Sequence, residues 1–403
     1  MKNVFLIGNG FDLHHMLPTQ YYDFMCVANY LKNHHMLFPI TIGEIFSKCT
    51  ESENIKKSYD EYKKIFNSTE IKADNIIQIS DFLHDNVWFN YFLKTLNKNL
   101  GWIDFEKEIF TVINTLYNIL KTADDSLCLP RNELLPPFIL LNFSFFVVES
   151  DKAAIRPGQT LSIKEEYLVE QPFNSRIYVV DKKKIFDELY KYLLDFNRAL
   201  NLYFHCFVEN ALELLSKNNK NKIDLIGLAD ISISFNYTST LEVLYSAQEV
   251  FHIHGKISDE NLVLGVNPNE ADDIGTKDTA LIKFKKYYQR EKFGTDIEYI
   301  NWYRTTIGKK AEYRIVVFGH SLDETDSDII SDMFLNAKEI YISYYNDKCK
   351  DDYVANLTKM FGANGFDRFR KEKQLQFVSL SEINALMDEL KPEEIKWEQT
   401  ASY

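Results

Sequence analysis

Short apolar runs and longer amphipathic segments alternate along much of the chain. Residues Asn3 to Gly8 form a compact apolar run that stops at a Gly-Asn-Gly turn, the pattern of a buried strand that leads into a helix. Polar segments with helical spacing separate several later runs of the same kind. These later strand candidates begin at Asp224, Glu249, Leu262, Arg314, Glu339 and Leu375. Strands that alternate with helices predict an α/β fold with a doubly wound, mostly parallel, Rossmann-like sheet.

The part of the chain between the first strand candidate and the later ones has a different pattern. From about Gln20 to Asn221, long polar and aromatic segments show helical spacing, so we expect a large α-helical insertion that interrupts the sheet. The predicted domains are a discontinuous sheet domain of residues 1–20 plus 223–395 and a helical insertion domain of residues 21–222. The polar stretch from Ser216 to Lys222 is the expected hinge.

The composition narrows the class of protein. The chain has 403 residues, and 46 Lys and Arg against 59 Asp and Glu give a formal net charge of −13. This balance disfavours nucleic acid as a partner, because binding to a phosphate backbone rests on a basic surface. Apolar residues make up 45% of the chain and aromatic residues 14%, which indicates a globular protein with a substantial core.

Cysteine usage and apolar run lengths indicate where the protein works. The five Cys residues are scattered and form no Cys-x-x-Cys pair, so we expect reduced thiols and neither a disulfide framework nor a zinc ribbon. The first apolar run is too short for a signal peptide. The longest apolar stretch, Phe138 to Val148, is shorter than the ~20 residues that span a bilayer. We expect a soluble cytoplasmic protein without a membrane partner.

The first candidate for chemistry is the turn after the first strand. Two glycines between a strand and a helix allow the backbone to approach a phosphate or ribose closely, and the helix start supplies amide donors. A tight strand-to-helix turn without a ligand explains the same pattern, because the third glycine of a dinucleotide fingerprint is absent. The candidate binding residues in this region are Gly8, Asn9, Gly10, Phe11, Asp12, Pro18 and Thr19.

The second candidate is Asn236, at the end of a β-branched run. A Thr-Ser-Thr cluster follows it and opens a helix, with Thr238 or Ser239 as the expected N-cap. Asn236 would then lie at the carboxyl edge of the sheet, where open α/β sheets bind ligands. The alternative is that Asn236 only caps a turn, which is the commoner role of Asn.

The third candidate is a pair of histidines, His252 and His254, at alternate positions of a predicted strand. This spacing predicts that both rings lie on one face of the sheet. No carboxylate or Cys stands at ligand spacing beside them, so a metal site is not expected. His254 precedes Gly255 at the strand end, which suits a titratable group that contacts a sugar hydroxyl. His252 is interpreted as a hydrogen-bonded core histidine.

The fourth candidate is the turn after the strand that begins at Arg314. Gly319, His320 and Ser321 would bring amide and hydroxyl donors to the same sheet edge. The acids that follow are interpreted as helix-start residues, and a metal site made from them is the alternative that we do not adopt. These acids are Asp323, Glu324, Asp326 and Asp328.

Five motifs follow one another in an order that is not generic. They are "GNGFDLHHMLPTQYYDF", "GWIDFE", "SFNYTSTLE", "HIHGK" and "GHSLDETD". In this order the chain resembles the AbiH-type bacteriophage abortive infection family along nearly its whole length. The same skeleton is more distantly similar to sirtuin-like NAD-binding proteins, which have a Gly-rich first turn, an Asn at a strand end, a His-Gly pair and a Gly-x-Ser-Leu turn.

The resemblance implies a sirtuin-like nucleotide-binding domain for the discontinuous part of the chain. Gly8, Gly10, Leu17 and Pro18 match residues that wrap NAD, Asn236 and His254 match residues near the nicotinamide ribose, and Gly319, Ser321 and Leu322 match the turn under the adenosine half. The four-Cys zinc module of deacylating sirtuins is missing, and the insertion has no acyl-lysine groove that we can identify. The resemblance therefore implies hydrolysis of NAD to nicotinamide and ADP-ribose rather than protein deacylation.

The residues suit that chemistry. Cleavage of the N-glycosidic bond passes through an oxocarbenium-like ribose, so the site needs orientation and a dry pocket more than a strong nucleophile. In this hypothesis the catalytic residues are Asn236, which positions the attacking water, and His254, which accepts a proton from a ribose hydroxyl. NAD is the only cofactor or substrate expected, and no metal is predicted.

The function predicted from the sequence is that of an antiphage effector that consumes NAD, with a phage-derived trigger and further copies of the chain as its other partners. The alternative is a non-catalytic nucleotide sensor that contacts a partner through the insertion. A nuclease is a third hypothesis, which the negative charge disfavours. The acids Asp104, Glu106 and Glu108 are interpreted as an acidic helix start and stay outside the catalytic set.

Overall fold

The computed structural model describes residues 1–34, 36–98, 104–122, 128–129, 146–148, 161–171, 174–216, 221–266, 279–306 and 312–391. The chain forms two compact units, which are described separately. Unit 1 comprises Met1–His15, Asn218–Ile253 and Asp296–Tyr403, and unit 2 comprises Met16–Lys217 and His254–Thr295. The domain boundaries drawn from the sequence stay a prediction. Residues 217–220 of the expected hinge, 392–395 of the sheet domain and 101–103 of the "GWIDFE" motif lie outside the described residues.

Unit 1 is built on a sheet of six strands, and every pairing between neighbours is parallel. Across the sheet the strands are β10 (Val250–His252), β9 (Ile231–Ser234), β1 (Lys2–Ile7), β11 (Tyr313–Phe318), β12 (Glu339–Tyr344) and β13 (Leu375–Ser379). Numbered by their order in the chain, the strands follow the sequence 3-2-1-4-5-6, which is that of dinucleotide-binding Rossmann folds. The predicted doubly wound, mostly parallel sheet is confirmed.

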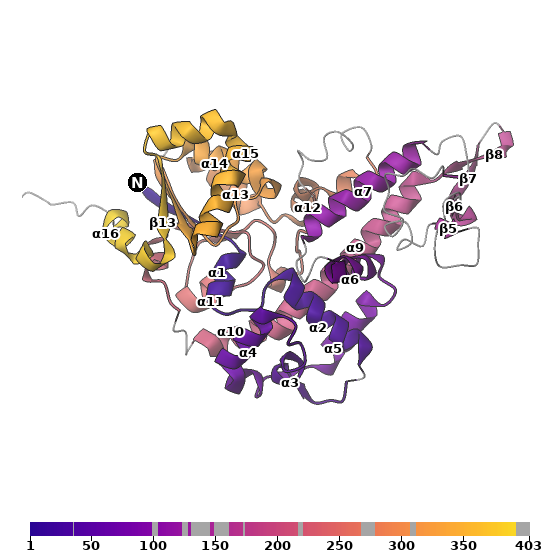
Figure 1. Cartoon of the computed structure of the whole chain (residues 1–403), viewed down its shortest axis with the longest axis horizontal. Helices are drawn as coiled ribbons and strands as arrows, with labels where there is room; N and C mark the ends of the chain where they lie inside the picture. The colour runs from indigo at the N-terminus through magenta and orange to yellow at the C-terminus, as the bar shows by residue number, and fades with distance from the viewer. Residues whose placement is uncertain are drawn as a thin grey trace, which may run out of the picture. The chain divides into compact units, whose positions relative to one another are not determined.

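Helices cover both faces of this sheet because side chains of each strand alternate between two apolar cores. Val4, Leu6, Ile315 and Val317 point into one core, with α13 (Ile297–Thr306), α14 (Ser327–Asn336) and α15 (Asp347–Lys371). Figure 1 shows α14 and α15 stacked beside the sheet. Phe5, Ile7, Val316 and Phe318 point into the other core, with α1 (Asn9–His14), α11 (Thr240–Tyr245), the 3₁₀ turns Asp224–Leu228 and Leu380–Leu386, and α16 (Met387–Leu390).

Two strand predictions differ from the structure. The run that begins at Asp224 opens with the 3₁₀ turn, and only Ile231–Ser234 joins the sheet. Leu225 and Ile226 of this turn are buried as neighbours, without the alternation of a strand. The run from Leu262 to Val266 is also buried but joins no sheet of the described residues, and an isolated bridge pairs Val266 with Lys285. Short apolar runs of this kind signal burial, and burial alone does not distinguish a strand from a core loop.

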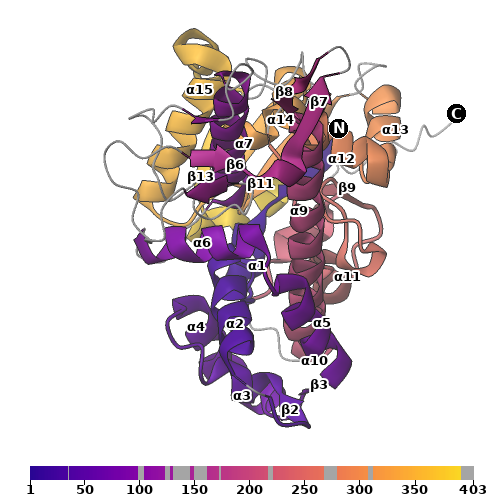
Figure 2. The ribbon, with the colours of Figure 1, turned by 90° about the vertical axis from the view of Figure 1, so that its right-hand side faces the viewer.

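Unit 2 is mainly helical, as the sequence predicts for most of the insertion. Its helices are α2 (Tyr21–Asn33), α3 (Ile42–Phe46), α4 (Glu53–Phe66), α5 (Ala73–Leu83), α6 (Val87–Lys98), α7 (Phe105–Thr122), α9 (Lys182–Phe204), α10 (Asn210–Ser216) and α12 (Lys286–Phe293). The long helix α9 lies alongside α5 and α6 (Figure 2). Four phenylalanine rings pack together in this core, with centroids no more than 5.4 Å apart in each contacting pair. They belong to Phe24, Phe92, Phe105 and Phe196. The high aromatic content therefore builds this core.

Small antiparallel sheets in unit 2 are a feature that the helical interpretation missed. Two two-residue strands, β2 (Ile40–Thr41) and β3 (Glu70–Ile71), pair with each other. A second group pairs β6 (Leu161–Ile163) with β4 (Cys128–Leu129) and β5 (Phe146–Val148), and a third pairs β7 (Leu168–Gln171) with β8 (Asn174–Val180). The strands of the first two groups have only two or three residues, too few for an alternating pattern to stand out.

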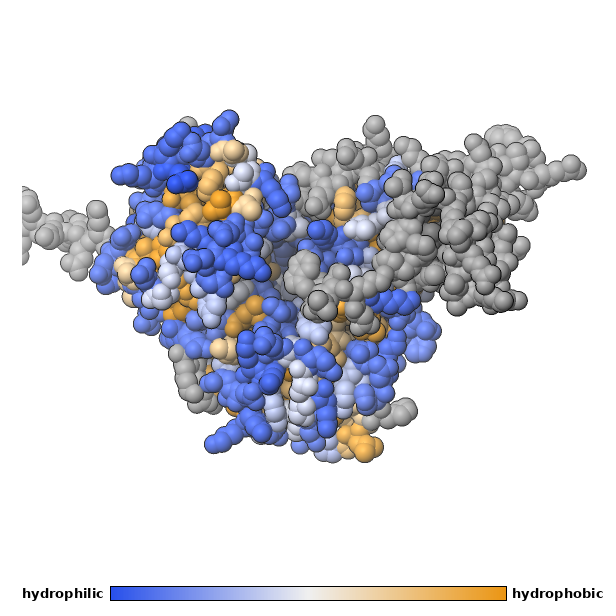
Figure 3. Space-filling model, in the orientation of Figure 1, coloured by the Kyte–Doolittle hydropathy of each residue, from blue (hydrophilic) through white to orange (hydrophobic). Residues whose placement is uncertain are grey.

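Among the described residues, no helix combines the length and the apolar character needed to cross a bilayer. On the face drawn in Figure 3, hydrophilic residues cover most of the described surface, and the hydrophobic residues gather in smaller separate groups.

Candidate functional site

The candidate site lies in unit 1, at the carboxyl edge of three neighbouring strands. β9, β1 and β11 are adjacent and parallel, so the residues that follow Ser234, Ile7 and Phe318 meet at one edge. The strand order reverses between β1 and β11, and open α/β sheets bind ligands at such switch points. The sheet therefore brings three of the four predicted motifs together.

The turns after β1 and β11 are bonded directly to each other. The amide of Gly8 donates to the carbonyl of Phe318 at 3.0 Å, and the amide of Gly10 donates to the carbonyl of Gly319 at 2.8 Å. A Cβ added to Gly8 would meet the Cα of His320 at 2.4 Å, and one added to Gly10 would meet the Cα of Gly319 at 2.8 Å. The space that these glycines leave open is therefore occupied by the neighbouring turn of the same chain.

Asn236 is fixed from three sides. Its side-chain Nδ2 donates to the carbonyl of Gly8 at 3.1 Å, and its backbone amide donates to the Oγ of Ser234 at 3.2 Å. Its own carbonyl accepts from the Nδ1 of His252 at 3.1 Å. The side-chain Oδ1 accepts no hydrogen bond from the described residues. Asn236 is 7% exposed, so its buried amide presents an oxygen that is available to a small donor.

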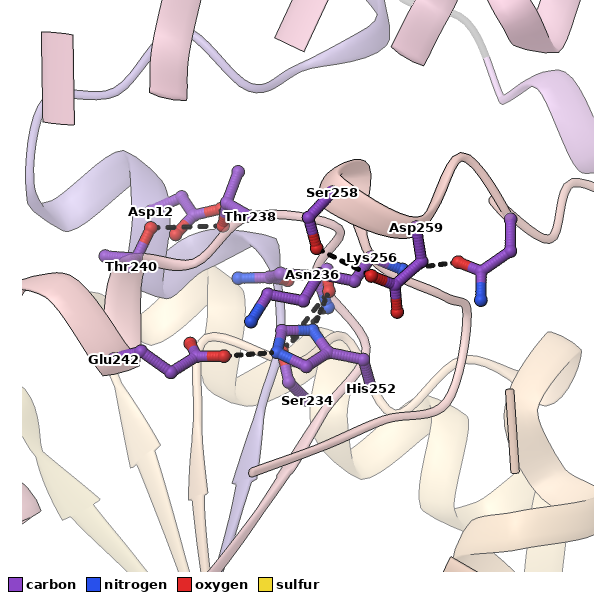
Figure 4. Close-up of polar contacts among 11 residues, drawn as sticks. Asp12, Ser234, Asn236, Thr238, Thr240, Glu242, His252, Lys256, Ser258 and Asp259 are labelled. Atoms are coloured by element: carbon purple, nitrogen blue, oxygen red, sulfur yellow. Dashed lines mark hydrogen bonds and ion pairs between the residues drawn. The ribbon is translucent and has the colours of Figure 1, made fainter. Parts of the chain in front are cut away.

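His252 connects this asparagine to the helix that follows it. Its Nε2 lies 3.0 Å from the Oε1 of Glu242 in the first turn of α11, while its Nδ1 faces the carbonyl of Asn236. Figure 4 shows the ring between Glu242 and the end of β9. The predicted hydrogen-bonded histidine is confirmed, and its side chain is only 9% exposed. The prediction that His252 and His254 share one face of a strand is wrong, because β10 ends at His252 and His254 lies beyond it.

A buried polar chain links α1 to the residues after β9. The hydroxyl of Thr240 donates to that of Thr238 at 3.0 Å, and Thr238 donates to the Oδ2 of Asp12 at 2.7 Å (Figure 4). Asp12 is 1% exposed. The N-cap of α11 is Ser239, as one of the two expected positions, but it makes no side-chain capping bond. Thr238 binds the carboxylate instead, so Asp12 does more than complement a helix start.

His320 packs into the edge beside these residues. Its Nδ1 accepts from the amide of Leu322 at 2.9 Å, and its Nε2 lies 3.4 Å from the Oδ2 of Asp326. Because Nδ1 is an acceptor here, the proton of the neutral ring is on Nε2, facing the carboxylate. The ring of Phe235 stands edge-on at 4.2 Å. Both His320 and Asp326 are buried, whereas Ser321 is exposed.

The acids after β11 lie at the starts of two successive helical segments, as their interpretation predicts. Asp323 is the N-cap of the 3₁₀ turn Glu324–Asp326, and its side chain accepts from the amide of Thr325 at 3.2 Å. Among the described residues, no three His, Cys, Asp or Glu side chains gather as a metal site would need.

Phe11 belongs to the core under the turn. Its ring is fully buried against Phe318 and Tyr245, so its side chain serves packing. His15, one turn later, donates from Nδ1 to the carbonyl of Phe11 at 2.8 Å and accepts from the hydroxyl of Tyr245 at 2.8 Å. Burial lowers the pKa of His15 to about 4, with a further lowering from His14, although the Phe11 hydrogen bond opposes the shift. The ring is therefore neutral over the physiological range.

Three of the predicted residues lie in unit 2. The carbonyl of Pro18 accepts from the hydroxyl of Tyr203 at 2.7 Å, and Thr19 is buried beside it in the chain. The carbonyl of His254 accepts from the amide of Val263 at 2.7 Å. Gly255 has φ +84, and a Cβ there would meet the carbonyl oxygen of Asn261 at 2.3 Å. This glycine makes a turn whose open side is filled by Asn261, so it leaves no space there for a ligand.

Asp104 and Glu106 of the "GWIDFE" motif, and Glu108 two residues after it, are also in unit 2. Asp104 accepts from the amide of Lys107 at 3.1 Å, which confirms its role at a helix start. Glu108 accepts from the hydroxyl of Tyr91 at 2.5 Å. Glu106 forms an ion pair of 2.8 Å with Lys286, whose side chain is fully buried. Two of the three acids therefore hold structural contacts that spacing alone does not reveal.

Sequence reasoning missed the contact between Glu242 and His252. The signal that could have found it is the order of neighbouring strands. Glu242 lies in the first turn of the helix after β9, and His252 ends β10, which pairs with β9 in parallel. Their approach follows once that pairing is known.

Unit 1 thus defines an α/β protein with an open, doubly wound parallel sheet and a buried polar cluster at its carboxyl edge. Residues 4–345 match the model of a protein family described as "Bacteriophage abortive infection AbiH", so the chain belongs to the AbiH family. No curated protein and no solved structure matches the chain. The resemblance found in the motifs is confirmed at the level of the family.

Proposed function

We propose that this AbiH protein binds NAD at the carboxyl edge of unit 1 and hydrolyses it to nicotinamide and ADP-ribose during abortive infection. The observation that carries the proposal is the position of Asn236. It stands at the end of β9, beside the switch point of a sheet with dinucleotide-binding strand order, and its amide is oriented by the carbonyl of Gly8.

The proposed reaction requires Asn236 only to orient the attacking water. In the proposed reaction the bond between C1′ of the ribose and the nicotinamide nitrogen breaks, and the bond electrons leave with nicotinamide. Water forms the new bond to C1′ and releases one proton. Since the Nδ2 of Asn236 is committed to Gly8, its Oδ1 is the atom that can accept from the attacking water. Orientation of this kind is worth a large factor in rate when the reacting atoms are held in line.

The glycine turns contribute rigidity in this proposal. Gly8 and Gly10 pack against Gly319 and His320, so their first role is to lock two strand ends together. A ligand at this edge would contact the outer surface of the turns and the exposed Ser321 rather than a cavity between the glycines. The buried chain from Asp12 to Thr240 supports the edge from the side of β9.

The remaining assignments rest on the resemblance. His254 would accept a proton from a ribose hydroxyl, and Pro18 and Thr19 would contact NAD. Because these residues belong to unit 2, they are proposals separate from the site in unit 1, and His254 is the one tested by substitution. His254→Gln should abolish turnover while leaving the circular dichroism spectrum of the chain unchanged.

The experiment incubates the purified full chain with NAD and separates the products by chromatography. We expect nicotinamide and ADP-ribose in equal amounts, and a loss of about 10²-fold in rate for Asn236→Ala. Asn336→Ala is the matched control, because Asn336 is exposed at the end of α14. NAD that binds without turnover would support the alternative of a nucleotide sensor, and NAD that does not bind would refute the proposed site.

A further inference from the structure

We propose that His252 is a positioning residue for Asn236, a role that rests on the proposed function. The juxtaposition that carries the inference is the ring of His252 held between the carbonyl of Asn236 and the carboxylate of Glu242 (Figure 4). All three residues lie in unit 1, and two parallel strands and the helix between them supply them.

The sheet register explains why the ring reaches this place. His252 lies opposite Ser234 in the parallel pair of β10 and β9, and the amide of Ile253 donates to the carbonyl of Ser234 at 2.9 Å. Both strands therefore end at the same level of the sheet. A side chain at the last position of β10 can then reach the backbone two residues beyond the end of β9, which is Asn236.

The partners of the ring determine what it does. The carbonyl of Asn236 can only accept, so Nδ1 donates to it, while Nε2 faces the carboxylate of Glu242. The His252 side chain is 9% exposed and that of Glu242 is 25% exposed. A ring held at both nitrogens is fixed against rotation, and hydrogen bonds to a charged group are stronger than neutral ones.

His252 completes the set of bonds that fixes Asn236. The backbone amide of Asn236 is held by Ser234 and its side chain by Gly8, so the carbonyl bonded to His252 is the third constraint. Ser234 also donates to the same carbonyl, at 3.3 Å. Loss of the His252 bond would allow the peptide after Asn236 to rotate and would move its side-chain oxygen. A displacement of about 1 Å in a catalytic group lowers the rate about 10²-fold.

A purely structural tie between α11 and β10 is the competing explanation, and two substitutions separate the two roles. In His252→Asn, the side-chain amide nitrogen lies near the place of the ring Nδ1, so it keeps the donor toward Asn236 and loses Glu242. In His252→Gln, the longer side chain reaches Glu242 and loses the donor toward Asn236. A positioning role requires the first variant to keep more activity, and a structural tie requires the opposite order.

The test measures kcat and KM for nicotinamide release by the full chain and these two variants, with thermal melting as a check on folding. We expect kcat to fall about 10²-fold in His252→Gln and less than about tenfold in His252→Asn, with KM little changed. Glu242→Gln, which keeps an acceptor for Nε2, should retain most of the activity even if both histidine variants fold poorly. His205→Gln, at an exposed position, is the control.

The outcomes separate this inference from the function on which it rests. Equal kcat for the wild type and His252→Gln, or a lower kcat in His252→Asn than in His252→Gln, overturns the positioning role and leaves NAD hydrolysis intact. A wild-type chain that releases no nicotinamide overturns both, because no reaction then remains for His252 to serve.

Discussion

The amide of Gly10 donates to the carbonyl of Gly319 at 2.8 Å, so the first turn of the chain is bonded to the turn after β11. Gly319 has φ +66, and a Cβ on it would meet the backbone nitrogen of Phe11 at 2.3 Å. Both conformation and space therefore require glycine at this position.

Gly319→Ala tests how tightly the two turns are packed. We expect the free energy of unfolding to fall by about 2 kcal/mol or more. The alanine would have to adopt a left-handed backbone conformation, and its Cβ would clash with the backbone of Phe11. Gly227→Ala is the control, since a Cβ there meets nothing within 4 Å. Urea denaturation followed by circular dichroism measures both changes. Equal stability for the two variants would contradict the packing described here.

Thr238 tests the buried chain to Asp12. Thr238→Val keeps the shape of the side chain and removes the hydroxyl that donates to the carboxylate at 2.7 Å. We expect a loss of about 1–3 kcal/mol in unfolding free energy, the usual effect of taking a donor from a buried acceptor. Thr238→Ser retains the hydroxyl and should lose less. If denaturation curves of the two variants coincide, the hydroxyl is not the stabilising group.

Several parts of the fold could be read from the sequence. β1, β11, β12 and β13 each coincide with an apolar run bounded by turn residues, and their alternation with helices led to the parallel sheet. Three of the four candidate motifs meet at one edge because parallel strands end together. The local pattern was sufficient to predict a strand wherever the strand's own sequence determines which of its residues are buried.

Other features depend on neighbours that the sequence does not name. The burial of Leu262 to Val266 looks the same in a strand and in a core loop. The role of Gly10 depends on which turn lies opposite, and the contact of His252 with Glu242 depends on strand order. These are relations between distant segments, so no local spacing encodes them.

The neutral ring of His15 makes unit 1 sensitive to acid. Its pKa is lowered from the ordinary value of 6.5 to about 4, chiefly by burial. The stability that depends on the neutral ring is present above pH 6.5 and is lost as the pH falls from 6.5 toward 4. Between pH 7 and pH 5 this amounts to about 2 kcal/mol. Burial lowers the pKa of His14 as well, which adds a loss of the same sign.

Comparison with His15→Gln isolates this contribution from groups of opposite sign. In unit 2 burial raises the pKa of Asp23 from 3.8 to about 6, despite hydrogen bonds from Ser52, Gln20 and Asn54. Stability that rests on the protonated Asp23 is lost as the pH rises through about 6. The wild type should therefore lose more unfolding free energy than His15→Gln on going from pH 7 to pH 5. Parallel pH dependences would show that His15 is not the group responsible.

The buried ion pair of Glu106 and Lys286 predicts a strong effect in unit 2. The Lys286 ammonium is fully buried, and Glu106→Gln removes the carboxylate charge 2.8 Å from it. We expect a loss of about 3–5 kcal/mol in unfolding free energy, because removing one partner leaves a buried charge poorly compensated. Glu53→Gln removes one partner of an exposed pair at 3.6 Å and should change stability by no more than about 0.5 kcal/mol. Effects of equal size would mean that burial does not strengthen the inner pair.

A measurement of the NAD concentration in infected cells tests the central proposal most directly, because the chain is then exposed to any trigger that it requires. Cells that carry the wild-type chain or Asn236→Ala are infected with a phage that the wild type restricts, and NAD is measured through the infection. The proposal predicts that NAD falls and ADP-ribose rises with the wild type only, and that the variant no longer protects. Restriction by the wild type at constant NAD would contradict it.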